Sequence, residues 1–190
     1  GQNTITYVAW NWKAASTASG TTTGSGDAEA YSARYNTDAG FSMITYLGNG
    51  TDNHAIPHHL GSKPQFITVK KRNDTGGWAI YNATSGATKH MYLDTTAAEA
   101  TSHQLWSEAE PTSSVFNTWT NTENNGNDES YIAYCFHSVD GYSKVGSYTG
   151  NGNADGTFVY TGFRQAWIMV KHTTQSESWT IWDTDRDTYN

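Results

Sequence analysis

Two short segments of the chain share one alternating pattern of apolar and polar positions. They are "YVAWNWK" at residues 7–13 and "YIAYCFH" at residues 131–137. Alternate residues of a strand point to the same face, and in both segments the alternate positions carry large apolar or aromatic side chains. The pattern predicts two equivalent strands, each with an aromatic face.

Two longer pairs of segments follow these strands in the same order. "GFSMITYLGNG" at 40–50 matches "GYSKVGSYTGNG" at 141–152, and the one extra residue is what a β-bulge would add. "FITVKKRNDTGGWAIYN" at 66–82 matches "WIMVKHTTQSESWTIWD" at 167–183 without a gap. Each member of the second pair has two β-branched and aromatic runs around a polar loop, which predicts a hairpin.

The chain therefore contains an internal repeat. Its two copies lie at about 40–82 and 141–183, and each is preceded by a matching strand. A few strands alone leave an apolar face uncovered and are marginally stable. We expect the two copies to face each other as the halves of one antiparallel β-sandwich that spans residues 1–190, of the concanavalin-like or jelly-roll kind. Its core is expected to be built around Trp10, Trp12, Trp78, Trp167, Trp179 and Trp182.

The segments between the copies differ in kind. Residues 14–39 are small and polar, which predicts a long surface loop or a weak edge ribbon. Residues 83–130 contain apolar runs that predict further strands, together with a short helical turn around Thr96–Ala100.

Composition agrees with a single all-β domain and removes several classes of partner. The chain has 190 residues, 14% of them aromatic, and a net charge of −7, which argues against nucleic acid. No apolar run approaches the roughly 18 residues of a membrane span, so we expect a soluble protein. The single cysteine, Cys135, excludes an internal disulfide, and its place between aromatic neighbours in a strand predicts a buried, unreactive thiol.

The acidic residues do not form the arrangement that sugar hydrolysis requires. Glycosidases place two carboxylates across the scissile bond, in a jelly roll on one strand face. The i, i+2 acidic pairs here lie in or beside polar loops, where solvated carboxylates are the expected role, so we predict no catalytic residue, no cofactor and no enzyme activity. These pairs are Asp27/Glu29, Glu108/Glu110 and Asp183/Asp185/Asp187.

Two segments raise the question of a metal ion. "HAIPHH" brings His54, His58 and His59 close in sequence, but adjacent side chains of an extended segment point in opposite directions, and no cysteine or carboxylate with zinc-site spacing accompanies them. "DTDRD" at 183–187 has the oxygen spacing with which calcium loops begin, yet it lacks their glycine and final glutamate. We therefore assign no metal site, and calcium at 183–187 stays open as an alternative.

The order of these motifs resembles an uncharacterised repeat domain of tail-fibre-like and other virion-associated proteins of marine bacteriophages. The resemblance covers nearly the whole chain, and its most specific stretch is "GYSKVGSYTGNGNADGTFVYTGFRQAWIMVK" at 141–171. It implies a concanavalin-like or jelly-roll sandwich on the outside of a virion, and it carries over no catalytic or ligand residues. The chain departs from the family pattern at Pro57–His58 and at Asp187–Thr188.

Two classes of function follow as expectations. The first is a non-enzymatic structural or appendage protein of a bacteriophage, such as a tail fibre or capsid decoration, which binds other virion proteins and its own copies through sheet edges and aromatic patches. The alternative is an adhesin that recognises host surface glycans, and a glycosidase-like enzyme ranks third. The candidate sugar-binding residues are Trp106, Trp119, Tyr189, Asn124, Asn127 and Asp155.

Overall fold

The computed structural model of the protein describes residues 9–101 and 104–185. These residues contain thirteen strands and no helix, which confirms the all-β, antiparallel sandwich class predicted from the sequence. With no helix in the described part, none is present there that could span a membrane. The predicted helical turn around Thr96–Ala100 is wrong, because residues 96–99 have no regular structure and Ala100 begins a strand.

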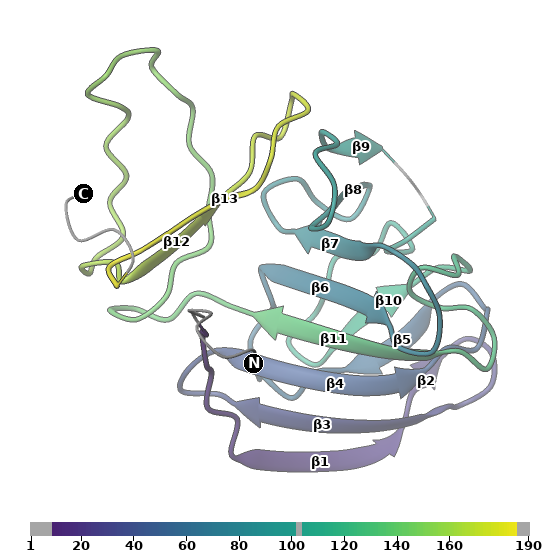
Figure 1. Ribbon diagram of the computed structural model, residues 1–190. Helices are drawn as coiled ribbons and strands as arrows, with labels where there is room; N and C mark the ends of the chain where they lie inside the picture. Colours follow the sequence, from purple (N-terminus) through teal and green to yellow (C-terminus); the bar gives the residue numbers. More distant parts are fainter. Residues whose placement is uncertain (1–8, 102–103, 186–190) are drawn as a thin grey trace, which may run out of the picture.

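One layer of the sandwich is an eight-stranded antiparallel sheet in the order β1-β3-β4-β11-β6-β7-β8-β9 (Figure 1). β1 and β3 form its edge, and they arise from the segment expected to be a loop or a weak edge ribbon. Most of β1 is exposed, as suits an edge. The strands are β1 (Ser16–Thr21), β3 (Ala30–Asn36), β4 (Phe41–Leu47), β6 (Phe66–Lys71), β7 (Trp78–Asn82), β8 (Lys89–Tyr92), β9 (Ala100–Thr101) and β11 (Ser130–Phe136).

The second layer is a small sheet in the order β10-β5-β2, which lies behind the large sheet in Figure 1. It consists of β2 (Thr23–Gly24), β5 (His54–Pro57) and β10 (Val115–Thr118). Ile56 and Phe116 of this layer, together with Trp106, belong to the same fully buried cluster as Ile44 and Val69 of the large sheet. The core therefore lies between these two layers.

β11 occupies the middle of the large sheet and confirms the strand predicted at 131–137. It pairs along its length with β4 on one side and β6 on the other. Its alternate residues Tyr131, Ala133 and Cys135 are fully buried on the core face. Without β11, β4 and β6 would have no common neighbour among the strands of this sheet.

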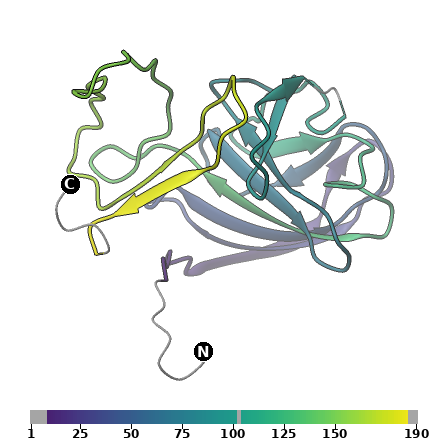
Figure 2. The same ribbon diagram turned by 45° about the horizontal axis from the view of Figure 1, so that its top comes forward.

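The second copy lies outside the sandwich. Its hairpin, β12 (Trp167–Val170) and β13 (Thr180–Asp183), forms a separate two-stranded sheet to one side in Figures 1 and 2. The expectation that the copies are facing halves is therefore wrong. The covering layer comes instead from β2, β5 and β10, segments that the repeat pattern does not include.

The tryptophans expected in the core are mostly outside it. Trp10, Trp12 and Trp182 are 37%, 41% and 37% exposed, whereas Trp106, a proposed sugar ligand, is 1% exposed in the core. Trp78 is half-buried and stacks on Tyr134, with ring centroids 6.2 Å apart, on the face of the large sheet opposite to Ala79. Trp167 and Trp179 are also half-buried.

The predicted strand at 7–13 falls partly outside the described residues, which begin at residue 9. Residues 9–13 form no strand. Instead, the Trp12 ring packs against Phe41 and Phe136 at the end of the large sheet, with ring centroids 6.0 and 5.8 Å apart.

A buried polar network explains the Gly-Asn-Gly turn of the first copy. The Asn125 side-chain oxygen accepts from the Asn49 backbone N–H at 3.0 Å and lies 2.8 Å from His54 Nδ1. The Asn125 amide donates to the carbonyls of Thr51 and Trp119. Gly48 packs so closely that an added Cβ would lie 2.4 Å from the Gly126 carbonyl oxygen, so a side chain at Gly48 is excluded.

Replacing Asn125 with alanine is expected to lower the free energy of unfolding by about 2–4 kcal/mol, because several buried polar groups lose their partners together. Asn127→Ala is the matched control. That side chain is exposed and its amide donates only to the adjacent Asp128 in the structure, so the expected change is within about 0.5 kcal/mol. Urea unfolding of both variants measures the difference, and equal stabilities would contradict the structural role of Asn125.

Candidate functional site

The proposed sugar-binding residues do not come together. Asn124 is fully buried and donates to the Leu105 carbonyl at 2.7 Å, so it belongs to the core with Trp106. Asn127 and Asp155 are exposed on separate loops, and Trp119 is half-buried. Tyr189 lies outside the described residues. No site can be built from this set.

Of the i, i+2 acids, Glu110 has a clear structural role. Its carboxylate accepts hydrogen bonds from Tyr81 Oη at 2.6 Å, Lys63 Nζ at 2.7 Å and the Ala87 backbone N–H at 2.8 Å. Burial raises its pKa, but the bonds from Lys63, Tyr81 and Ala87 outweigh that effect and hold the pKa below its usual value. Glu110 therefore ties the β7 region to the loop before β10.

The other acids are apart from it. Asp27 and Glu108 are exposed, and Asp183 lies buried at the end of β13. Asp183 accepts from the Asp185 backbone N–H at 3.2 Å, an interaction that shapes the turn after β13. Asp187 falls outside the described residues, so the calcium alternative at 183–187 stays a hypothesis.

The three histidines of "HAIPHH" have different neighbours. His54 Nε2 lies 2.6 Å from the Thr22 hydroxyl, and His58 Nε2 lies 3.2 Å from the Thr112 carbonyl. His59 Nε2 lies 3.0 Å from Tyr31 Oη. Within residues 9–101 and 104–185, no three His, Cys, Asp or Glu side chains are gathered as a metal site requires.

Cys135 has the environment expected from the sequence. Its side chain is fully buried in the core, and this burial raises the pKa of the thiol far above its ordinary value. The reactive thiolate form of Cys135 is therefore disfavoured, which agrees with the prediction of an unreactive thiol.

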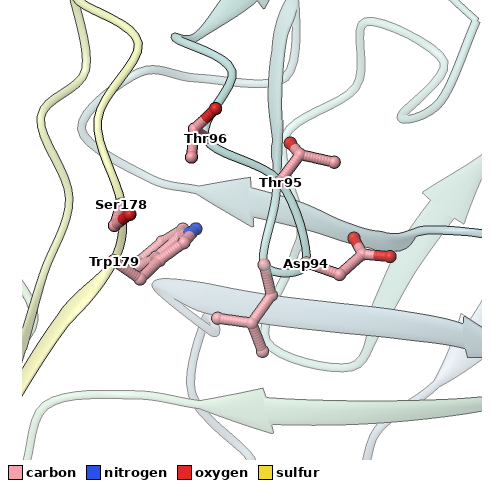
Figure 3. A pocket seen from close by; sticks show the side chains of 6 residues that line it. Asp94, Thr95, Thr96, Ser178 and Trp179 are labelled. Atoms are coloured by element: carbon pink, nitrogen blue, oxygen red, sulfur yellow. The ribbon is translucent and has the colours of Figure 1, made fainter.

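The described residues form a shallow, open hollow between the loop after β8, which follows the first copy, and the second copy. Figure 3 shows it between the loop after β8 and the segment that enters β13. Its volume is about 280 Å³. It is lined by Leu93, Asp94, Thr95, Thr96, Ser178 and Trp179.

Hydrogen bonds between the second copy and the segment after β7 hold the walls of the hollow. Trp179 Nε1 donates to the Tyr92 carbonyl at 2.8 Å, and the Glu99 backbone N–H donates to the Thr173 carbonyl at 2.8 Å. On the opposite wall, the Asp94 carboxylate accepts from the Trp78 backbone N–H at 3.1 Å. These contacts fix the indole of the second copy against β8 and the loop that follows it.

The lining favours binding over catalysis. An indole beside a carboxylate and three hydroxyls can stack on a sugar ring and bind its hydroxyl groups. Asp94 is the one acid among the six lining residues, which include no histidine or cysteine, so they supply neither a carboxylate pair nor a nucleophile with its base.

A second candidate surface is the loop at residues 148–160, which we call the aromatic loop. It belongs to the long segment that projects away from the sandwich in Figures 1 and 2. Thr157 donates to the Thr149 carbonyl at 2.6 Å, which holds the two arms together. Tyr148, Phe158 and Tyr160 are 53%, 86% and 78% exposed on it.

Sequence reasoning missed both surfaces. Trp179 was expected in the core together with Trp78, the residue with which it aligns. In the structure both tryptophans are half-buried and lie outside the core. Asp94, Thr95 and Thr96 belong to a polar turn and carry no motif, so no sequence signal joins them to a residue more than eighty positions away.

Comparison with protein families gives one match. The profile described as "Domain of unknown function (DUF7483)" matches residues 1–190, which include both copies of the repeat. The chain belongs to this family. No curated protein and no solved structure matches this DUF7483 chain.

The buried histidines predict a pH-dependent stability. Burial lowers the pKa of His58 from 6.5 to about 4, against the opposing effect of its bond to Thr112. As the pH falls, the unfolded chain protonates His58 before the folded protein does. The contribution of His58 to the free energy of unfolding is therefore fully present above about pH 6.5, and it falls by about 3 kcal/mol as the pH drops to 4. Burial also lowers the pKa of His54, which adds to the loss in the same direction.

Thermal unfolding between pH 7.5 and 4 measures this effect. The His58→Asn variant is expected to lose less stability over that range than the wild-type protein, and His172→Gln, a change at an exposed residue, serves as control. Parallel stability curves for wild type and His58→Asn would show that His58 does not carry the dependence.

Proposed function

We propose that this DUF7483 domain is a non-enzymatic structural module on the outside of a bacteriophage particle, as part of a tail fibre or capsid decoration. The aromatic loop carries the proposal. It offers Tyr148, Phe158 and Tyr160 to solvent on a segment that projects from the sandwich. An exposed aromatic surface of this kind is better suited to contact with other proteins than to catalysis.

The distribution of exposed apolar side chains supports this function. Among the described residues, every large hydrophobic side chain that is strongly exposed lies outside the sandwich, either before β1 or after β11. Inside the sandwich, the polar groups Asn125, His54 and Glu110 are used in structural hydrogen bonds. The sandwich acts as a closed support, and the residues beyond it supply the contact surface.

The contact proposed is with further copies of this chain, because most protein assemblies are built from identical subunits. Sedimentation velocity of the wild-type protein is expected to show association that depends on concentration. The variant Tyr148→Ser/Phe158→Ser/Tyr160→Ser is expected to weaken that association by about tenfold or more, because aromatic side chains dominate interface energies.

The control for this experiment is Tyr31→Ser, which changes a half-buried tyrosine of β3, inside the large sheet and remote in sequence from the aromatic loop. A wild-type protein that stays monomeric at all concentrations would contradict self-assembly through the loop. Equal association of wild type and triple variant would contradict the role of the three aromatic residues.

Glycan binding is the second candidate, and the hollow at Trp179 favours it. If the domain is an adhesin, a glycan array is expected to give saturable signals from monomeric protein. Trp179→Ala would then weaken binding by about tenfold, the cost of losing about 1.4 kcal/mol of ring contact. Trp182→Ala, at a more exposed tryptophan of the same hairpin, is the matched control, and an array without signal rejects this candidate.

A further inference from the structure

The hairpin of the second copy repeats the first in exact register. Ile67 pairs with Tyr81 across β6 and β7, and Ile168 pairs with Trp182 across β12 and β13. These are equivalent positions of the ungapped match between 66–82 and 167–183. The structure thus supports the sequence alignment residue by residue at this hairpin.

The two hairpins differ in what lies beside them. The free edge of β6 is covered by β11, which joins it to β4. Among the described residues, β12 pairs only with β13, so its equivalent edge is open. Ile67 is fully buried, whereas Ile168 is 41% exposed.

The sequence contains one counterpart of β11, the matching segment at 7–13. We propose that residues 9–13 of the same chain insert between 142–147 and β12 as the missing central strand of the second copy. In this position Ala9 corresponds to Ala133 and lies opposite Val170, as Ala133 lies opposite Val69. The sequence match of residues 9–13 with 133–137 sets this register.

One contact of this arrangement is already present. In the first copy, Phe136 of β11 packs on Phe66 of β6, with ring centroids 6.1 Å apart. Trp12 and Trp167 are the equivalent residues, and their ring centroids are also 6.1 Å apart. Trp10 contacts the same Trp167 ring at 6.3 Å. These contacts place residues 10 and 12 of the same chain beside the open edge of β12, and we take this neighbouring segment as the occupant.

The insertion would have a direct effect on the projecting segment. The aromatic loop connects 142–147 to the residues that lead into β12, so a strand paired with both would hold the two ends of the loop together. An open edge would also be removed, which lowers the tendency of β12 to pair with other chains. The inference concerns the support of the loop and does not depend on what the loop binds.

An engineered disulfide tests the register. Residues directly opposite in an antiparallel pair have Cα atoms about 4.5–5.5 Å apart, within the range that a disulfide spans. Ala9→Cys with Val170→Cys is therefore expected to form a bond inside one chain under mild oxidation. In the control, Ala9→Cys with Met169→Cys, the second cysteine points to the opposite face and bonding is expected to be at least about tenfold slower.

Electrophoresis without reducing agent and peptide mapping decide the outcome. A bond between residues 9 and 170 in the monomer, with little bonding in the control, supports the proposal. A bond only between chains assigns the strand to a second copy and overturns it. Equal bonding of both pairs, or none in either, overturns the register. Cys135 is buried and is left unchanged.

Limited proteolysis gives a second readout that needs no cysteine. Trypsin cleaves after Lys144 and Arg164, which flank the aromatic loop. Removal of residues 1–13 is expected to speed both cleavages by about tenfold or more, because the central strand is lost. Unchanged rates would overturn the proposal. Neither assay measures self-association or glycan binding, so failure here is distinct from failure of the proposed function.

Discussion

The structure depends on one strand that joins two others. β11 separates β4 from β6 and pairs with both along their whole length. Its core-facing side chains, Tyr131, Ala133 and Cys135, lie in the middle of the buried cluster. Because β11 is the strand that precedes the second copy, the sheet of the first copy is completed by a strand from outside its own sequence.

Burial of polar groups is the second constraint. The turn at 48–50 is held by Asn125, a residue more than seventy positions later, which also contacts the buried His54. In the second copy, Asn151 is the equivalent of Asn49; it is exposed and donates within its own loop to the Gly156 carbonyl. The same sequence motif thus closes a sandwich corner in one copy and a projecting loop in the other, because the turn of the first copy bonds to a distant residue, Asn125, and Asn151 bonds within its loop.

The sequence predicted the strands of the repeat and missed the layer that covers them. Alternation identified β4, β6, β7, β11 and the hairpin of β12 and β13, since strand periodicity is a local property. β10 lies in residues 83–130, where further strands were predicted, but the covering layer was missed because its partner β5 is a short segment about sixty residues earlier. Trp106 was named as a candidate sugar ligand, but it packs in the core against Tyr81, a residue distant in sequence. The hollow at Trp179 depends on how the second copy lies against the loop after β8, which no local pattern contains.

Native-state hydrogen exchange tests the central role of β11 most directly. If β11 holds the sheet, its amides and those of β4 and β6 exchange only through global unfolding, with one common free energy of opening. The account predicts this shared, slowest class of amides in the three strands. Exchange of β11 through a smaller opening, while β4 and β6 stay protected, would contradict it.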